Sequence, residues 1–199
     1  MPSNTSDLTS LIGSRICHDL ISPLGAISNG VELLSMNGAP IGPEMSLISE
    51  SVENANARIR FFRIAFGSAN ETQDVGQKEI QSILHDMSRG GRLSIEWQPQ
   101  GDQKRLQVKL AFLLLQCFET AMPWGGHVSV SAVGDQWAIF GEADKMKIEP
   151  DIWQVLSGVP SPGGISAAQV HFALAPVAAR EISRRLTVEC STNSARVRF

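Results

Sequence analysis

The chain of 199 residues contains no long hydrophobic run, and no stretch approaches the ~18–20 apolar residues that a membrane-spanning helix requires. It also has no large excess of charge, because the formal net charge of −3 at pH 7 gives no basic surface for nucleic acid. Residues 1–7 are polar and lack the basic and apolar regions of a secretory signal. We therefore expect a cytoplasmic protein that binds neither membranes nor nucleic acid.

Cysteine and histidine are both scarce. The three cysteines lie far apart and form no Cys-x-x-Cys pair, which is typical of reduced cytoplasmic thiols. Three of the four histidines fall in unrelated predicted elements without the spacing of metal ligands: His85, His127 and His171. The sequence has neither a P-loop nor a Gly-x-Gly-x-x-Gly motif. We therefore expect no metal site and no cofactor that belongs to this chain.

What the sequence does contain is a long amphipathic pattern over residues 14–34. At about 100° per residue, six apolar residues fall on one side of a helix: Ile16, Leu20, Leu24, Ile27, Val31 and Leu34. The opposite side carries polar residues and one glycine: Arg15, His18, Ser22, Gly25, Asn29 and Glu32. A lone histidine is more often an ordinary surface or core residue than a reactive one. The seam on the opposite side argues against a core position for His18.

The neighbours of His18 favour a reactive imidazole. Asp19 could hydrogen-bond one ring nitrogen and hold the tautomer that leaves the other nitrogen nucleophilic. Pro23 stands in the helix interior, where it removes one backbone hydrogen bond and is expected to kink the helix just after the histidine. Because such a proline costs about 3 kcal/mol, it requires either surrounding packing or a use for the bend.

The pattern predicts two long helices, one from Ser6 or Asp7 to about Met36 and one over residues 43–67, joined by a loop. The second helix has its own apolar seam: Met45, Ile48, Val52, Ala55, Ile59, Phe62 and Phe66. A lone helical hairpin cannot bury both seams, so we expect a homodimer held by a four-helix bundle. The alternative is that the seams pack only on the rest of this chain.

Beyond a polar linker at residues 68–74, helical and strand patterns alternate. Three helices are predicted at about residues 80–87, 106–117 and 167–186, the last interrupted by Pro176. Five strands are predicted near residues 93–97, 128–131, 137–140, 186–189 and 195–199. The expected fold class is therefore α+β, with a helical hairpin domain over residues 1–70 and an α/β sandwich domain over residues 71–199.

The run His18-Asp19-Leu20-Ile21-Ser22-Pro23 resembles the H-box of two-component sensor kinases, with one extra residue before the proline. Residues 18–34 and 58–67 are similar to the ChpT family of bacterial histidine phosphotransferases. The order of elements in the second domain resembles a degenerate form of the Bergerat-type ATP-binding domain of sensor kinases. In this alignment Leu113 and Cys117 replace the kinase asparagines and offer Mg²⁺ no oxygen. Residues 141–146 replace the Asp-x-Gly-x-Gly motif, so no autokinase activity is expected.

The resemblance implies that His18 is the nucleophile and carrier of a phosphoryl group, with Asp19 orienting its ring. It also implies partner-binding roles for four residues on the same face: Arg15, Ser22, Gly25 and Asn29. Arg15 would offset the charge of the phosphoryl group, and Gly25 would permit close approach of a partner backbone. Ser22 and Asn29 would form hydrogen bonds at the docking edge.

The resemblance further implies the partners of a phosphorelay. The donor would be the receiver domain of a hybrid histidine kinase, and receiver domains would supply the Mg²⁺. The acceptors would be response regulators of the CtrA and CpdR type. Two alternatives remain open: an active histidine kinase that binds ATP in an unusual way, and a non-enzymatic dimeric scaffold that binds receiver domains.

Overall fold

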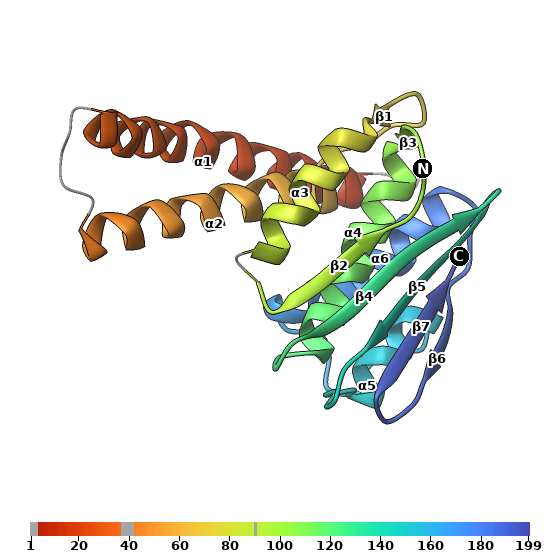
Figure 1. The fold of residues 1–199 in the computed structure, drawn as a ribbon. Coiled ribbons are helices and arrows are strands. Elements are labelled where there is room, and N and C mark those ends of the chain that lie inside the picture. Colours follow the sequence, from red (N-terminus) through yellow and green to blue (C-terminus); the bar gives the residue numbers. More distant parts are fainter. Residues whose placement is uncertain (1–3, 37–41, 90) are drawn as a thin grey trace. The chain divides into compact units, whose positions relative to one another are not determined.

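The computed structural model describes the backbone of residues 4–36, 42–89 and 91–199, and the side chains from residue 11 onward. The chain forms two compact units, one of residues 1–68 and 82–90 and the other of residues 69–81 and 91–199. Helices occur in both units and a mixed sheet in the second, so the expected α+β class is confirmed (Figure 1). Part of the expected interhelical loop, residues 37–41, lies outside the described residues.

The first unit is built on a hairpin of two long helices, α1 (Asn4–Met36) and α2 (Pro43–Ala65), which lie side by side in Figure 1. Helix α1 begins close to its expected start and continues through Pro23 without interruption. Helix α2 begins at a proline, whose missing N–H costs nothing at that position. Both long helices therefore form as their apolar periodicity predicts.

The N-terminal part of α1 lies close to the chain segment at the end of α2. A Cβ atom at Gly13 would lie only 2.9 Å from the carbonyl oxygen of Phe66, so the absence of a side chain allows the two chain segments to meet. The backbone N–H of Ser68 donates a hydrogen bond to Oγ of Ser14 at 3.0 Å. These contacts fix the chain as it leaves α2, one helical turn before His18.

The first unit also includes the C-terminal half of helix α3 (Gln77–Arg89), which the sequence analysis assigned to the second domain. The guanidinium of Arg60 donates through Nη1 to Oδ2 of Asp86 at 2.9 Å, which joins this half of α3 to α2. The contact is only partly exposed, so it is less screened by solvent than an ordinary surface ion pair. Helix α3 is therefore divided between the two units, whereas the sequence analysis placed the domain boundary before this helix, at residues 70/71.

The second unit contains a five-stranded sheet with the order β2-β4-β5-β7-β6. The strands, in sheet order, are β2 (Leu93–Trp97), β4 (Gly126–Val133), β5 (Gln136–Glu142), β7 (Ser194–Arg198) and β6 (Thr187–Cys190). Only the β2–β4 pair is parallel within the sheet. Three helices cover one of its faces: α4 (Arg105–Ala121), α5 (Pro150–Trp153) and α6 (Val170–Glu181) (Figure 1).

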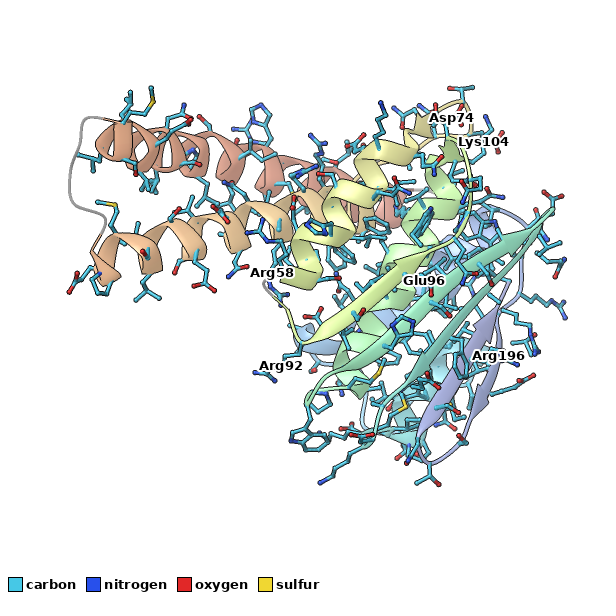
Figure 2. All side chains as sticks on the ribbon, in the orientation of Figure 1. Arg58, Asp74, Arg92, Glu96, Lys104 and Arg196 are labelled. Atoms are coloured by element: carbon cyan, nitrogen blue, oxygen red, sulfur yellow. The ribbon has the colours of Figure 1, made fainter. Side chains whose placement is uncertain are left out.

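The core of the second unit lies between the sheet and these helices. Alternate strand residues are buried there, including Val128, Val130 and Ile139, and Trp137 stacks on Phe199 with ring centroids 5.7 Å apart. The opposite face of the sheet is polar and open, and carries Glu96 and Arg196 among other residues (Figure 2). Burial of each large apolar side chain contributes roughly 1.5–3 kcal/mol, so this packing fixes the register of the sheet.

Short elements complete the second unit. The strands β1 (Asp74–Val75) and β3 (Gln103–Lys104) form a separate antiparallel pair, closed by an ion pair of 2.9 Å between Asp74 and Lys104 (Figure 2). Two 3₁₀ helices, η1 (Gln154–Ser157) and η2 (Ala167–Gln169), flank the segment before α6. These pieces, like α5, are too short to produce a periodic signal, and the sequence analysis did not predict them.

The helix expected over residues 167–186 needs correction at both ends and in its middle. Its first three residues form η2, and α6 itself ends at Glu181. Pro176 does not interrupt the helix, because α6 packs against α4 through several buried residues that outweigh one lost hydrogen bond. The end is set by Ser183, whose φ of 57° is left-handed and turns the chain away.

Candidate functional site

Three side chains on one exposed stretch of α1 are linked by hydrogen bonds. The side chain of His18 is 82% exposed, and its Nδ1 atom lies 3.3 Å from Oδ1 of Asp19. The other carboxylate oxygen of Asp19 accepts a hydrogen bond from Nε of Arg15 at 2.8 Å. Arg15 and Asp19 are four residues apart and therefore neighbours on the helix surface. The predicted site residues His18, Asp19 and Arg15 are thus brought together.

The electrostatics of this group define the tautomer of His18. The hydrogen bond from His18, with the charge and hydrogen bond of Arg15, holds the pKa of the Asp19 carboxyl below its ordinary value. The carboxylate is therefore ionised and can only accept hydrogen bonds. The ring nitrogen that faces it, Nδ1, must carry the proton, which leaves the lone pair on Nε2 directed away from Asp19.

Arg15 has a contact that was not predicted. Its guanidinium, which we expect to offset the charge of a phosphoryl group, pairs through Nε with Asp19. In this arrangement Arg15 holds the carboxylate that in turn holds the ring of His18. Its remaining N–H groups are exposed to solvent, since 76% of its side chain is accessible.

The other three predicted partner-binding residues follow His18 along the same side of α1. Ser22 and Asn29 are exposed, and neither side chain forms a hydrogen bond with any residue in the described part of the chain. A Cβ atom built on Gly25 would meet nothing within 4 Å. This side of the helix is therefore open to a partner along several turns.

Three apolar residues on this side were missed by the sequence analysis. Leu11, Ile21 and Leu33 are 56%, 37% and 59% exposed, and each falls within about 60° of His18 around the helix axis. The sequence could have indicated these three residues, because the same periodicity of about 100° per residue that placed His18 also places them on its side of the helix. We call the surface formed by Leu11, Arg15, His18, Ile21, Ser22, Gly25, Asn29 and Leu33 the His18 face.

The apolar seam predicted on the opposite side of α1 divides into two sets. Leu24 and Val31 are half-buried within the first unit. Four other members are between 46% and 53% exposed: Ile16, Leu20, Ile27 and Leu34. On α2, Ile59 is buried in the chain itself, whereas Ile48 is 46% exposed. The described chain thus leaves a row of large apolar side chains on α1 in water.

The second unit holds the two residues that the sequence analysis aligned with kinase asparagines. Leu113 and Cys117 are completely buried in α4, and the thiol of Cys117 donates to the carbonyl oxygen of Leu113 at 3.5 Å. Burial raises the pKa of Cys117 well above its ordinary value, so it remains a neutral thiol. Neither side chain reaches a surface where it could touch a nucleotide or a metal ion.

The remaining histidines have separate surroundings. His85 is exposed on α3, and His127 lies 3.6 Å from Glu96 on the open face of the sheet. His171 is buried, with Nε2 3.1 Å from Oγ1 of Thr120. Within residues 11–36, 42–89 and 91–199 no three His, Cys, Asp or Glu side chains are grouped as a metal site. No helix in the described part of the chain is long and apolar enough to span a membrane.

Three comparisons with known proteins all identify similarity to phosphotransferases. The model of a family described as "Histidine phosphotransferase C-terminal domain" matches residues 77–194. A curated protein of Brucella abortus (strain 2308), "Protein phosphotransferase ChpT", is 34% identical over 195 residues, with 92% of each protein covered. A solved structure described as "1.7 Angstrom Structure of a Bacterial Phosphotransferase" matches with a TM-score of 0.70 and 25% identity, over 100% of this chain and 98% of that one.

Proposed function

The chain belongs to the histidine phosphotransferase family, as residues 18–34 and 58–67 indicated, and we propose that it carries a phosphoryl group on His18 in a two-component phosphorelay. The donor is the receiver domain of a hybrid histidine kinase, and the acceptors are response regulators of the CtrA and CpdR type. The observation that carries this proposal is the exposed imidazole of His18, held through Nδ1 by an ionised Asp19. We place the reaction in the cytoplasm.

The transfer needs only one half of its active site from this chain. The Nε2 lone pair of His18 attacks the phosphorus of an aspartyl phosphate on the receiver domain. The bond from phosphorus to the aspartyl oxygen breaks as the N–P bond forms, and the receiver aspartate leaves as a carboxylate. The proton stays on Nδ1, where the negative charge of Asp19 stabilises the phosphorylated imidazolium. Transfer to an acceptor aspartate reverses these steps, with Mg²⁺ bound by the receiver domain.

The His18 face supplies the docking surface in this proposal. Ser22 and Asn29 offer unused polar groups, Gly25 leaves room for a partner backbone, and Leu11 and Leu33 offer apolar contacts at either end. Interfaces of this kind combine an apolar anchor with a small number of hydrogen bonds. We propose that the receiver domain covers this face when the phosphoryl group is transferred.

We also propose that the first unit forms a homodimer. The exposed members of the α1 seam lie about 160–180° from His18, so a second copy can cover them without obstructing the His18 face. Each fully exposed Leu or Ile forfeits roughly 1.5–3 kcal/mol relative to a buried one. Pairing of two hairpins into a four-helix bundle would recover part of this free energy.

The alternative of an active histidine kinase lacks support in the second unit. Leu113 and Cys117 are buried apolar groups where a kinase has asparagine, and no glycine-rich motif follows β5. We therefore propose that the chain does not phosphorylate itself from ATP. Isothermal titration calorimetry with ATP and Mg²⁺ should detect no binding, and micromolar affinity would restore the kinase alternative.

The proposed function is tested by mixing the full chain with a receiver domain that carries a radioactive phosphoryl group. Wild-type protein should acquire acid-labile label, and His18→Gln should acquire none while keeping the wild-type melting temperature, because His18 is exposed. His85→Gln is the matched control, since His85 is also an exposed helical histidine and should leave labelling unchanged. Label on His18→Gln, or none on wild type, would overturn the proposal.

A further inference from the structure

A small cavity of about 280 Å³ lies in the second unit, beside the C-terminal end of α6. Its walls combine an apolar floor with positive charge, and they include Leu156, Pro176, Leu186, Arg180, Arg184 and Arg185. The cavity is separate from the His18 face, which belongs to the first unit. Neither the proposed phosphotransfer nor the sequence analysis gives it a role.

The three arginines are brought together by the turn that ends α6. Arg180 lies in the last turn of the helix, and Ser183 follows with a φ of 57°. The backbone N–H of Arg184 donates to the carbonyl oxygen of Ala179 at 2.8 Å, which closes the turn. Ser183 is the one residue other than glycine with a positive φ in the described part of the chain. Glycine is usual at this position, because a left-handed conformation is strained for residues with a side chain.

The positive charge of this cluster is largely uncompensated. Arg184 lies 3.5 Å from Asp135, whose side chain is 85% exposed and therefore screens it only weakly. Arg180 and Arg185 are exposed, and neither guanidinium group forms an ion pair or hydrogen bond with any described residue. The partial negative charge at the helix end accounts for a cation at Arg180. It does not account for Arg185, which lies beyond the helix.

We propose that this arginine pocket binds an acidic segment of a partner protein. One aliphatic side chain of the partner enters the cavity, and carboxylates on either side of it pair with Arg180 and Arg185. The planar guanidinium group matches a carboxylate with two parallel hydrogen bonds, which makes arginine better suited than lysine to such a site. The apolar floor adds selectivity for a segment that alternates acidic and aliphatic residues.

Charge arithmetic favours a protein over the other acidic macromolecules. Attraction to an anionic membrane generally takes clusters of about 4–8 basic residues, and this cluster has three arginines. Binding of nucleic acid requires an extended basic surface, which a chain of net charge −3 does not offer here. A short acidic segment needs only two or three cations at close range, and it can use the cavity.

The test uses fluorescence anisotropy of the full chain with a fluorescein-labelled peptide in which one leucine is flanked by glutamates. Wild-type protein should bind this peptide, and the double variant Arg180→Glu, Arg185→Glu should bind it about tenfold or more weakly. Lys78→Glu is the matched control, because it reverses an exposed charge of the same unit outside the pocket. The double variant Arg180→Gln, Arg185→Gln provides a milder change should charge reversal disturb folding.

Several results would overturn this proposal. They are absence of binding by wild type, equal binding by the arginine variants, and equal binding of a peptide with glutamine in place of glutamate. Binding of phosphatidylglycerol vesicles or single-stranded DNA in preference to the peptide, with the same dependence on Arg180 and Arg185, would assign the pocket to a lipid or nucleic-acid partner instead. Because the assay involves no phosphoryl transfer, its outcome is independent of the role of His18.

Discussion

For single residues, the protonation state of each titratable group depends on the side chains around it and on its burial. Asp19 is surrounded by donors, so it stays ionised and fixes the proton of His18 on Nδ1. His171 has the opposite environment, because it is buried beside Phe172, with Oγ1 of Thr120 as the hydrogen-bond partner of its Nε2 atom. The same side-chain type is therefore an exposed, proposed nucleophile on α1 and a neutral buried group on α6.

The orienting role of Asp19 can be tested by Asp19→Asn. The amide keeps the size of the side chain but loses the charge that holds Nδ1–H and stabilises the phosphorylated ring. We expect transfer from a phosphorylated receiver to slow by about 10²-fold, the lower end of the range for a positioned acid–base group. Quench-flow measurements should show this loss, while Asp144→Asn, the same change at an exposed residue of the second unit, should not show it.

Burial of His171 predicts a loss of stability in acid. Desolvation lowers the pKa of His171 from 6.5 to about 4, so the folded state resists a proton that the unfolded state accepts. As the pH falls from 7 through 6.5 toward 4, the unfolded state binds more protons, and the free energy of unfolding decreases. This one group should contribute a decrease of up to about 3 kcal/mol.

The contribution of His171 can be separated from that of other groups by urea denaturation at a series of pH values. His171→Gln should remove its share of the acid-dependent loss, and His85→Gln is the control for replacing an exposed histidine. Identical pH profiles for wild type and His171→Gln would show that the histidine is not held neutral by its burial.

At the level of helices and strands, the sequence predicted the elements that have a clear apolar periodicity. Helices α1 and α2 and the five strands of the main sheet lie where their apolar patterns indicated. The end of α6 could not be predicted, because it depends on Ser183 adopting a left-handed conformation that serine rarely takes. The pairing of the two-residue strands β1 and β3 depends on tertiary packing rather than on local pattern.

The sequence also predicted part of the candidate site around His18. The helical periodicity placed His18 opposite an apolar seam, and the i, i+4 spacing of Arg15 and Asp19 also indicated their ion pair, although it was not used. The periodicity could not separate Leu24 and Val31, which are half-buried, from the exposed members of the same seam. That distinction depends on where α2 lies against α1, which no local pattern specifies.

The open surface of α1 at Gly25 gives a prediction about docking. Gly25→Leu should stabilise the folded protein by up to ~1 kcal/mol, because leucine favours a helix more than glycine and a Cβ atom there meets nothing within 4 Å. The variant should nevertheless slow transfer from a receiver domain by obstructing its approach. Direct labelling of His18 by phosphoramidate should stay normal, because a small molecule needs no docking surface.

The matched control for this prediction is Gly30→Leu. Gly30 is equally open and lies about 120° from His18 around the helix, outside the His18 face. It should gain similar stability without the loss of receiver transfer. Wild-type transfer rates in Gly25→Leu would mean that the receiver does not dock on this side of α1.

At the scale of the whole molecule, two surfaces on opposite sides of α1 have different proposed partners. The seam that includes Ile27 is proposed to pair with a second copy, and the His18 face is proposed to meet receiver domains. Ile27→Asp should therefore convert a dimer to a monomer in light scattering of the full chain, because the dimer would bury an unpaired charge. Leu33→Asp should keep the dimer, although Leu33 is even more exposed than Ile27, and should weaken receiver binding. A monomeric wild-type protein would contradict the proposed four-helix bundle.

In the proposed reaction, Nε2 of His18 carries the phosphoryl group while Nδ1 remains protonated beside Asp19. The most direct measurement is NMR of ¹⁵N-histidine-labelled protein after phosphorylation by a receiver domain, with phosphorus–nitrogen coupling used to identify the bonded atom. We predict one phosphohistidine, at Nε2 of His18, and its absence in His18→Gln. A phosphoryl group on Nδ1, or on any other residue, would contradict this account.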